Sequence, residues 1–434
     1  MRSPFKLFIH AAFAVLIVLA ASPVRADHQD KPVPLSLQSF TADAFKKNPG
    51  LEAKKKDYEA TRSKVIKAWL PEDPMVGVDV EGQSEFFDYD SRMNNETMIS
   101  QTIPFPTKLI LNGVIASKEA DIAYEKYQEE KRDLIWHIEE PYYELFMVKK
   151  TLSVLEENQI LLDQILQAVK SRYEANQASQ DEFLKAQIEL SKNGIEVFNM
   201  REKEHLAEAH FAHIVNVPLH TDYVLVDEET RSKLSYSREV LEKLVSKKRP
   251  ELKAFKIGVE RAKANAALMH TEWLPDITGR LETREFEDGR PRENDTFIGV
   301  SVPVWSLLKG IGGGWKSASD EVRAAEAIYQ DMKNEVLLKV HEAYSKVKSA
   351  ENAIQTYENF ILPQAKQQVQ VALSSYASGK TPFISLIDGQ RTLKSTQMEY
   401  YKAVADYEMG LADLRLAVGD DLNDPAKGAP NGKK

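Results

Sequence analysis

The sequence predicts a mixed α/β membrane protein, in which long antiparallel α-helical hairpins accompany four β-strands. Both kinds of element arise from an internal tandem duplication. A Trp-Leu-Pro corner occurs twice, in "KAWLPEDP" ending at Pro74 and in "TEWLPDIT" ending at Thr278. Alternating apolar and polar residues follow each corner, and a long segment with apolar residues at helical spacing comes after that. Repetition of this whole order indicates two copies of one unit.

Matching segments recur along both halves. "NPGLEA", from Asn48, matches "RPELKA", from Arg249, and "QTIPFP" matches "VSVPVW". Tyr173 matches Tyr376 in the same way. The partners lie roughly 200 residues apart, far more than the repeat length of a solenoid. The duplicated unit is therefore a large structural repeat.

The N-terminus has the three parts of a secretory signal. Arg2 and Lys6 precede the apolar run Leu7–Ala21, and "SPVRA" then ends in a small residue before Asp27. We expect a signal peptide over 1–26. A retained membrane anchor is the alternative, and it is disfavoured because the run is short for a spanning helix.

The signal and the duplication together define the expected organisation. The first structural repeat covers 27–230, with a β-hairpin over 75–105. The second covers 231–419, with a β-hairpin over 276–305. In each repeat the hairpin stands between a first helix and a long helical hairpin. A tail over 420–434 contains Gly, Pro and Lys and is expected to be disordered.

The first helix is expected over about Leu37–Trp69, and Pro71 and Pro74 end it because proline lacks an amide hydrogen and clashes with the preceding turn. "MVGVDVEGQ" then alternates, which predicts a strand with one polar face. "TMISQTIPF" is the returning strand. In the second half "ITGRLETREF" and "FIGVSVPVW" repeat the pattern, so this hairpin is expected to reach Trp305.

A heptad seam then follows, as in a coiled coil, with steps of three and four at Leu152, Leu155, Gln159, Leu162, Leu166, Val169 and Tyr173. The second half has the same phase. A long antiparallel helical hairpin follows from this pattern in each half. Its turn is expected near "ANQASQDE" in the first half and near "ASGKTPF" in the second, where Gly379 and Pro382 are typical turn residues.

Two β-hairpins cannot close a barrel on their own. An open sheet edge is excluded from lipid because its amides and carbonyls would lack hydrogen-bond partners. Oligomerisation would supply the missing strands. Three copies give twelve, an even number within the usual range for outer-membrane barrels.

The segments that support a family resemblance are "NPGL…WLP", "RPEL…WLP", "IPFPTK", "VPVW", "YEANQASQDEFLKAQIEL" and "YASGKTPFISLIDGQRTL". With them the chain resembles outer-membrane efflux proteins of the TolC family, from about Leu35 to Val418. The resemblance implies a homotrimer whose twelve-stranded β-barrel crosses the outer membrane of a Gram-negative bacterium and whose α-helical tunnel projects into the periplasm. It also implies a passive exit duct that docks on a periplasmic adaptor and on an inner-membrane pump, expected to be of the RND type.

Within that family, "LPEDP", "IPFPTK" and "QASQDEFLKAQIE" are most similar to the heavy-metal cation efflux branch. The chain departs from a metal carrier in one respect, because its nine His are scattered. A duct for drugs and small molecules, or for type I protein secretion, is the alternative. A soluble periplasmic coiled-coil adaptor is a further one, but adaptors have one helical hairpin and a lipoyl-like domain.

The resemblance also implies a constriction at the periplasmic entrance, formed by two carboxylates three residues apart. Here those positions hold Ser385 and Asp388, so one carboxylate is missing. Asp181 and Glu182 occupy the matching region of the first tip. A ring of Asp388 from three chains would repel anions and concentrate cations. The alternative is that Asp388 merely faces solvent on a helix.

Two further sets of residues have expected roles. The hairpin tips are expected to contact the adaptor, through Asn176, Gln177, Ala178, Ser179, Gly379, Lys380, Thr381 and Pro382. Trp69 and Trp273 stand beside the two corners, and aromatic side chains favour the membrane–water boundary. The alternative for both Trp residues is packing at the end of a helical bundle.

Other classes of function are disfavoured. The net charge of −9 argues against nucleic-acid binding, and the absence of Cys excludes thiolate chemistry. "GIGGGWKS" departs from the phosphate-binding loop, because its Lys follows Trp315, and is expected to be a flexible return into a helix. His210 and His213 are expected to be surface residues. We expect no enzymatic activity, no cofactor and no resident metal.

Overall fold

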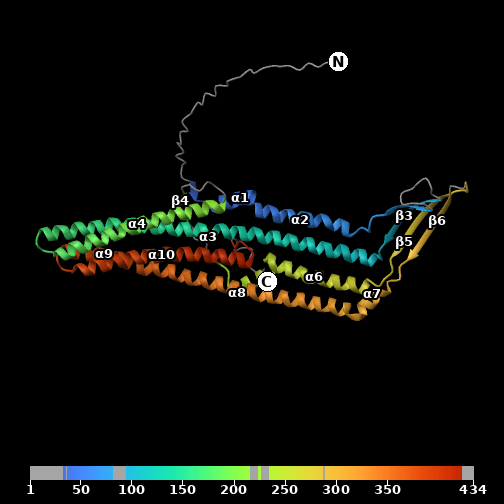
Figure 1. Cartoon of the computed structure of the whole chain (residues 1–434). Coiled ribbons are helices and arrows are strands. Elements are labelled where there is room, and N and C mark those ends of the chain that lie inside the picture. Colours follow the sequence, from blue (N-terminus) through green and yellow to red (C-terminus); the bar gives the residue numbers. More distant parts are fainter. Residues whose placement is uncertain are drawn as a thin grey trace, which may run out of the picture.

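The computed structural model describes residues 33–35, 37–81, 94–215, 223–225, 234–286 and 289–422. The expected signal peptide, the junction between the two repeats and nearly all of the expected tail lie outside these residues. The chain is elongated, with long helices side by side, a β-sheet at one end and helical turns at the other (Figure 1). The expected combination of long helical hairpins and four antiparallel strands is confirmed.

The expected first helix is two helices, so that prediction was wrong. α1 covers Leu37–Lys47 and α2 covers Pro49–Ala68. Asn48 between them is extended, because the ring of Pro49 disfavours helical backbone in the residue before it. The Asn48 side chain accepts a hydrogen bond of 3.0 Å from the Leu51 amide and so caps α2.

The second half breaks its first helix at the equivalent place. α5 covers Arg238–Lys248 and α6 covers Pro250–Thr271, with Arg249 extended between them. Arg249 is also the buried residue that joins this break to the end of the chain's last helix, since its guanidinium donates to the Leu416 carbonyl. In both halves, therefore, the residue before a proline is extended and breaks the first helix at the equivalent position.

Four strands form one antiparallel sheet in the order β2-β3-β5-β6. β2 covers Met75–Glu81 and β3 covers Asn94–Ile103, and these pair with each other. β5 covers Ile277–Phe286 and β6 covers Glu293–Val300. Pairing of β3 with β5 joins the two halves, so β2 and β6 are the edge strands of the single chain.

The last strand is shorter at its end than its alternation predicted. β6 stops at Val300, and α7, Val304–Lys309, begins where the strand was expected to continue to Trp305. Pro303 has no amide with which to extend the ladder. The glycine-rich segment after α7 is a π-helical turn, Gly310–Gly314, in which Gly313 has φ 132°. The expected flexible return is therefore a kinked helical connection.

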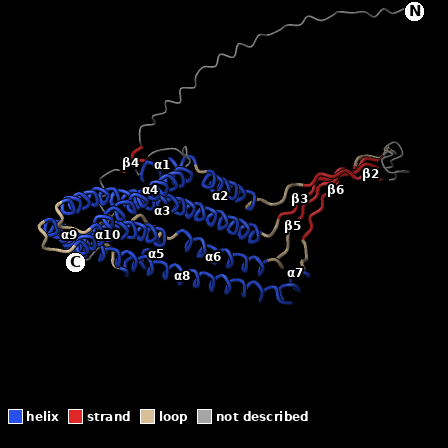
Figure 2. The backbone as a smooth tube through the Cα atoms, turned by 60° about the vertical axis from the view of Figure 1, so that its left-hand side comes forward, coloured by secondary structure: helices blue, strands red, loops and turns tan. Residues whose placement is uncertain are grey.

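The long helices run along the molecule between the sheet and the tips (Figures 1 and 2). In the first half α3 covers Pro106–Glu174 and α4 covers Gln180–Val215. In the second half α8 covers Trp315–Thr356. A π-helical turn, Tyr357–Ile361, then leads into α9, Leu362–Ala377, and α10 covers Phe383–Val418. Of these helices, α3 covers the whole distance, whereas α4 and α10 start at the tips and end partway along the molecule (Figure 1). A two-stranded parallel sheet, β1 (Val33–Leu35) with β4 (Tyr223–Leu225), lies beside α1.

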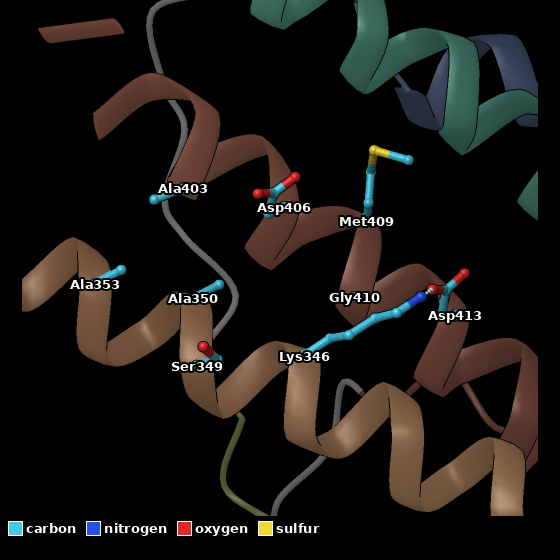
Figure 3. A pocket seen from close by; sticks show the side chains of 9 residues that line it. All are labelled: Lys346, Ser349, Ala350, Ala353, Ala403, Asp406, Met409, Gly410 and Asp413. Carbon is cyan, nitrogen blue, oxygen red and sulfur yellow. Dashed lines mark hydrogen bonds and ion pairs between the residues drawn. The ribbon is translucent and has the colours of Figure 1, made fainter. Parts of the chain in front are cut away.

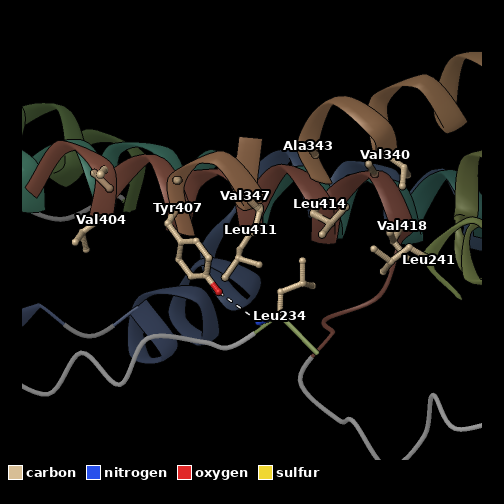
Figure 4. Packing of buried hydrophobic residues seen from close by; sticks show 14 of the residues in the cluster. Leu234, Leu241, Val340, Ala343, Val347, Val404, Tyr407, Leu411, Leu414 and Val418 are labelled. Atoms are coloured by element: carbon tan, nitrogen blue, oxygen red, sulfur yellow. Dashed lines mark hydrogen bonds between the residues drawn. The ribbon is translucent and has the colours of Figure 1, made fainter. Parts of the chain in front are cut away.

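The core is divided along the helices rather than gathered in one place. One cluster packs α8 and α10 against α5, and there Tyr407 accepts a hydrogen bond of 3.3 Å from the Leu234 amide (Figure 4). A second cluster packs α1, α3 and α4 around Phe211. A third lies at the tips, around Leu386. Among the described residues, no helix has both the length and the apolar character needed to cross a membrane.

Candidate functional site: the helical tips, the corners and the sheet

The turns at the two tips have the same backbone geometry. Asn176 has φ 56° and Gly379 has φ 74°, the left-handed conformation that Gly and Asn adopt most readily. The next amide in each turn bonds back into the helix. Gln177 donates to the Arg172 carbonyl at 2.8 Å, and Lys380 donates to the Ser375 carbonyl at 2.9 Å. The duplicated sequence therefore builds two equivalent tips.

A tyrosine makes polar contacts between the two tips. The Tyr376 hydroxyl, from α9, donates a hydrogen bond of 2.8 Å to a carboxylate oxygen of Glu182, on α4. The Arg172 guanidinium, on α3, lies 4.6 Å from the centroid of the Tyr376 ring and donates to the Tyr376 carbonyl. Burial, together with the hydrogen bond to Glu182, raises the pKa of Tyr376. Three helices from both halves thus meet at Tyr376.

The four residues expected at the entrance do not form one cluster in the single chain. Glu182 is held by Tyr376, whereas Asp181 pairs with Lys185 at 2.7 Å in solvent. Ser385 and Asp388 are exposed and one turn apart on α10. Within the described residues, no ion pair or side-chain hydrogen bond joins Asp388 to Asp181 or Glu182.

Arg172 and Tyr376 were not among the expected site residues. The match of Tyr376 with Tyr173 marked both positions, but it did not distinguish them. Tyr376 is 1% exposed, whereas Tyr173 is 39% exposed and stacks on Phe183. Tyr376 joins the two tips only because of how the two helical hairpins pack.

The second corner is tied to the first half by Asp276. Its carboxylate accepts hydrogen bonds from the Phe105 amide at 3.0 Å and from Lys108 at 2.8 Å. Partial burial acts in the opposite direction, but these two donors hold the pKa of Asp276 below its usual value. The Asp276 amide also donates to the Ser301 hydroxyl at 2.7 Å. One carboxylate therefore aligns both hairpins where the strands meet the helices.

Trp69 and Trp273 are both about half exposed, at 43% and 45%. The Trp69 ring lies against Gly113 on α3, so closely that a Cβ atom at position 113 would stand 2.2 Å from it. Part of the Trp69 side chain remains exposed. Trp69 therefore packs on the bundle and also presents an aromatic surface beside the sheet.

The sheet has one apolar face and one charged face. Val76, Ile99 and Leu281 stand in register on the apolar face and are 68%, 45% and 57% exposed. On the other face Glu96 and Arg284 stand in register and form an ion pair of 3.1 Å. In a soluble antiparallel sheet the apolar face is buried and the polar face is solvated. Here the sheet is reversed, because the apolar side chains are the more exposed ones.

A groove of about 480 Å³ lies between α8 and α10 (Figure 3). Small residues such as Ala350 and Gly410 line most of it. Asp413 at its rim is already bound, by Trp136 Nε1 at 2.9 Å and by Lys346 at 3.2 Å. The groove therefore has no set of convergent reactive groups. Within the described part of the chain, no group of three His, Asp or Glu side chains is arranged to hold a metal.

Comparison with known proteins gives a family match. Residues 243–420 match the family described as "Outer membrane efflux protein". The outer membrane protein TolC of Vibrio cholerae is 22% identical over 324 residues, which cover 70% of this chain and 72% of that protein. The alkaline protease secretion protein AprF of Pseudomonas aeruginosa is 20% identical, over 69% of this chain and 64% of its own length.

A third relative is named for metal resistance. The cobalt-zinc-cadmium resistance protein CzcC of Cupriavidus metallidurans is 23% identical over 151 residues, which are 35% of each chain. Among solved structures, the outer-membrane channel OprN superposes with a TM-score of 0.74 at 14% identity, covering 89% of this chain and 91% of OprN. CusC superposes with a TM-score of 0.73 at 13% identity, covering 90% and 93%. These superpositions establish a shared fold.

Proposed function

The chain belongs to the outer membrane efflux protein family and, from that premise, we propose that it carries heavy-metal cations out of the cell. Members of this family are non-enzymatic transport proteins. The chain is the outer-membrane exit duct of a tripartite efflux system of a Gram-negative bacterium, and its helices extend into the periplasm. The nature of the cargo is the proposal.

The observation that supports the duct is the reversed sheet at the end of the helices. Its exposed apolar face, with Val76, Ile99 and Leu281, suits lipid, and its charged face suits water. β2 and β6 have unpaired edges in the single chain. Three copies, each pairing β2 with the β6 of its neighbour, give a closed barrel of twelve strands without open edges.

The opposite end of the molecule is then the periplasmic entrance. Asn176–Ser179 and Gly379–Pro382 are exposed or partly exposed turns on rigid helices, which suits contact with a periplasmic adaptor. Asp388 is exposed one turn after Ser385, and three copies of it would form a negative ring. We infer that an inner-membrane pump of the RND type supplies the energy, since members of this family are non-enzymatic transport proteins.

The choice of cations as cargo is supported by charge and by one relative. CzcC, which matches over 35% of this chain, is named for resistance to cobalt, zinc and cadmium. Negative charge at the entrance favours the passage of cations over anions. The competing proposal is secretion of a protein, since AprF is named for secretion of a protease. Transport of drugs is the other alternative.

Deletion of the gene in its host tests the cargo. We expect the deletion strain to become sensitive to Co²⁺, Zn²⁺ and Cd²⁺, and plasmid-borne wild-type protein to restore growth. Sensitivity to organic drugs alone, or loss of a secreted protein with unchanged metal tolerance, would contradict the metal proposal and leave the duct intact. The duct has its own test, because the detergent-extracted protein should sediment as a trimer that conducts ions in a planar bilayer.

A further inference from the structure

The charged face of the sheet contains two cross-strand rows. Asp79, Glu96, Arg284 and Glu293 stand opposite one another across the four strands, in that order. Glu282 and Asp295 stand opposite each other in the neighbouring row, and Arg280 lies one row further toward the helices. Residues in register across antiparallel strands share a face, so all seven side chains belong to one surface.

Both arginines of this surface are already engaged by carboxylates. Arg284 pairs with Glu96 at 3.1 Å and lies 3.7 Å from Glu282. Arg280 pairs with Glu282 at 3.1 Å, and its guanidinium lies over the ring of Phe297 at 5.2 Å. Glu96 and Glu282 are each only 12% exposed, because these contacts cover them. The two bases are therefore balanced by two acids.

Three carboxylates of the surface have no such base. Asp79, Glu293 and Asp295 are exposed, and none forms an ion pair with another described residue. Among these seven side chains, five carboxylates and two guanidinium groups leave a difference of three negative charges per chain. The lipid-suited face of the same strands has its apolar residues at the same levels, such as Val78 beside Asp79. The excess charge is thus confined to one side of the sheet.

We propose that this face lines the membrane-spanning end of the pore as a second cation-selective filter, formed by Asp79, Glu293 and Asp295 and separate from the periplasmic entrance. The inference rests on the proposed duct, in which three copies place this surface around one lumen. Nine unneutralised carboxylates then surround the exit. A ring of like charges with low-dielectric walls concentrates hydrated cations and excludes anions.

The physics also predicts how the filter responds to salt. Mobile ions screen wall charges over about 8 Å at physiological ionic strength and over about 3 Å at 1 M. Cation preference from this face should therefore be large in dilute KCl and weak in 1 M KCl. A site that binds a dehydrated ion at short range would lose much less of its cation preference in 1 M KCl.

Reversal potentials of the assembled full-length protein in planar bilayers test the filter. The recordings use an Asp388→Ala background, so that the entrance ring does not contribute. In that background the channel should still prefer K⁺ over Cl⁻. The triple change Asp79→Asn, Glu293→Gln and Asp295→Asn should lower the K⁺/Cl⁻ permeability ratio about sevenfold in dilute salt. A pore potential that falls by roughly one kT per unit charge changes the local concentrations of K⁺ and of Cl⁻ each about threefold, in opposite directions.

Glu285→Gln is the matched control. Glu285 lies next to Arg284 on β5, but on the opposite face, and it pairs with Arg292. This change removes one negative charge per chain at the same level of the sheet and should leave the permeability ratio unchanged. If the triple variant does not assemble as a trimer, Asp295→Asn alone should give about a third of the logarithmic shift.

Three results would overturn the filter. One is an unchanged ratio in the triple variant, and another is complete loss of cation preference in Asp388→Ala alone. The third is an equal effect of Glu285→Gln. A wild-type chain that is monomeric or does not conduct would contradict the duct itself, which is a different and distinguishable outcome.

Discussion

Tyr376 and Glu182 join the two helical tips of the chain by a hydrogen bond of 2.8 Å, although they lie in different halves of the duplicated sequence. The Tyr376 side chain is 1% exposed, and the Arg172 guanidinium lies over its ring. This contact acts together with the Arg391–Glu189 ion pair of 2.6 Å and the hydrophobic cluster at the tips to fix the second hairpin against the first. The first prediction follows directly from it.

Tyr376→Phe should loosen the tips without unfolding the chain. The change removes one hydrogen bond to a carboxylate, worth about 1.5–3 kcal/mol, and keeps the ring in its packed site. Backbone amides of 176–182 and 378–381 should then exchange hydrogen for deuterium faster, and mean conductance should rise. Tyr173→Phe is the control, because Tyr173 stacks on Phe183 and is not part of this contact. Equal exchange in both variants would contradict the role of Tyr376.

Asp388→Ala should reduce the cation preference of the channel in planar-bilayer recordings. Asp388 is exposed on α10, and three copies at a narrow entrance would dominate its potential. Ser385→Asp makes the opposite change, adding a carboxylate one turn away, and should increase the preference. Unchanged selectivity in both variants would show that this face of α10 does not line the pore.

Gly113→Ala should destabilise the corner by about 1–3 kcal/mol, because an added methyl group overlaps the packed Trp69 ring and forces it to move. The thermal midpoint of the detergent-solubilised protein measures this loss. Gly312→Ala, at the matching position of the second half, meets no heavy atom within 4 Å and should cause none. In a Trp69→Ala background the Gly113 change should become tolerated, and a full penalty there would rule out the Trp69 contact as its cause.

Glu129→Gln should stabilise the protein at alkaline pH. Burial, and then the neighbouring Glu251 and Asp133, raise the pKa of Glu129 to about 7, although Arg249 and Lys126 act in the opposite direction. Below the ordinary pKa of 4.5 the Glu129 carboxyl is protonated in both the folded and the unfolded chain, so Glu129 causes no loss of folding stability there. Between pH 4.5 and 7 the folded chain binds more protons, so stability falls as pH rises.

Thermal midpoints of the wild type and the variant across that window test the sign. The advantage of Glu129→Gln should be absent near pH 4.5, grow up to about pH 7 and then stay constant. Glu335→Gln is the comparison, since a hydrogen bond from Lys339 lowers the pKa of Glu335. An advantage of Glu129→Gln that did not vary with pH would indicate a packing effect instead.

Several features of the candidate site were predictable because they depend on neighbours in sequence. Pro71 and Pro275 mark the corners, and Asn176 and Gly379 mark the tips, since each residue type restricts or permits particular backbone angles. The break at Asn48 was missed because the expected helix was read through to Pro71, although Asn-Pro carries the signal for a new helix start. The early end of β6 at Val300 was missed in the same way, since alternation continues past it.

The sequence alone determined the duplicated order of helices and strands, the corners and turns between them, and the polar and apolar faces of each strand. Those features follow from backbone restrictions and side-chain periodicity, which act over a few residues. Only the tertiary structure decided that β3 pairs with β5, that Asp276 ties the two hairpins together, and that Tyr376 is buried against Glu182 whereas its counterpart Tyr173 is exposed. Equivalent residues in a duplicated chain have the same local signals, so packing between distant segments gives them different roles.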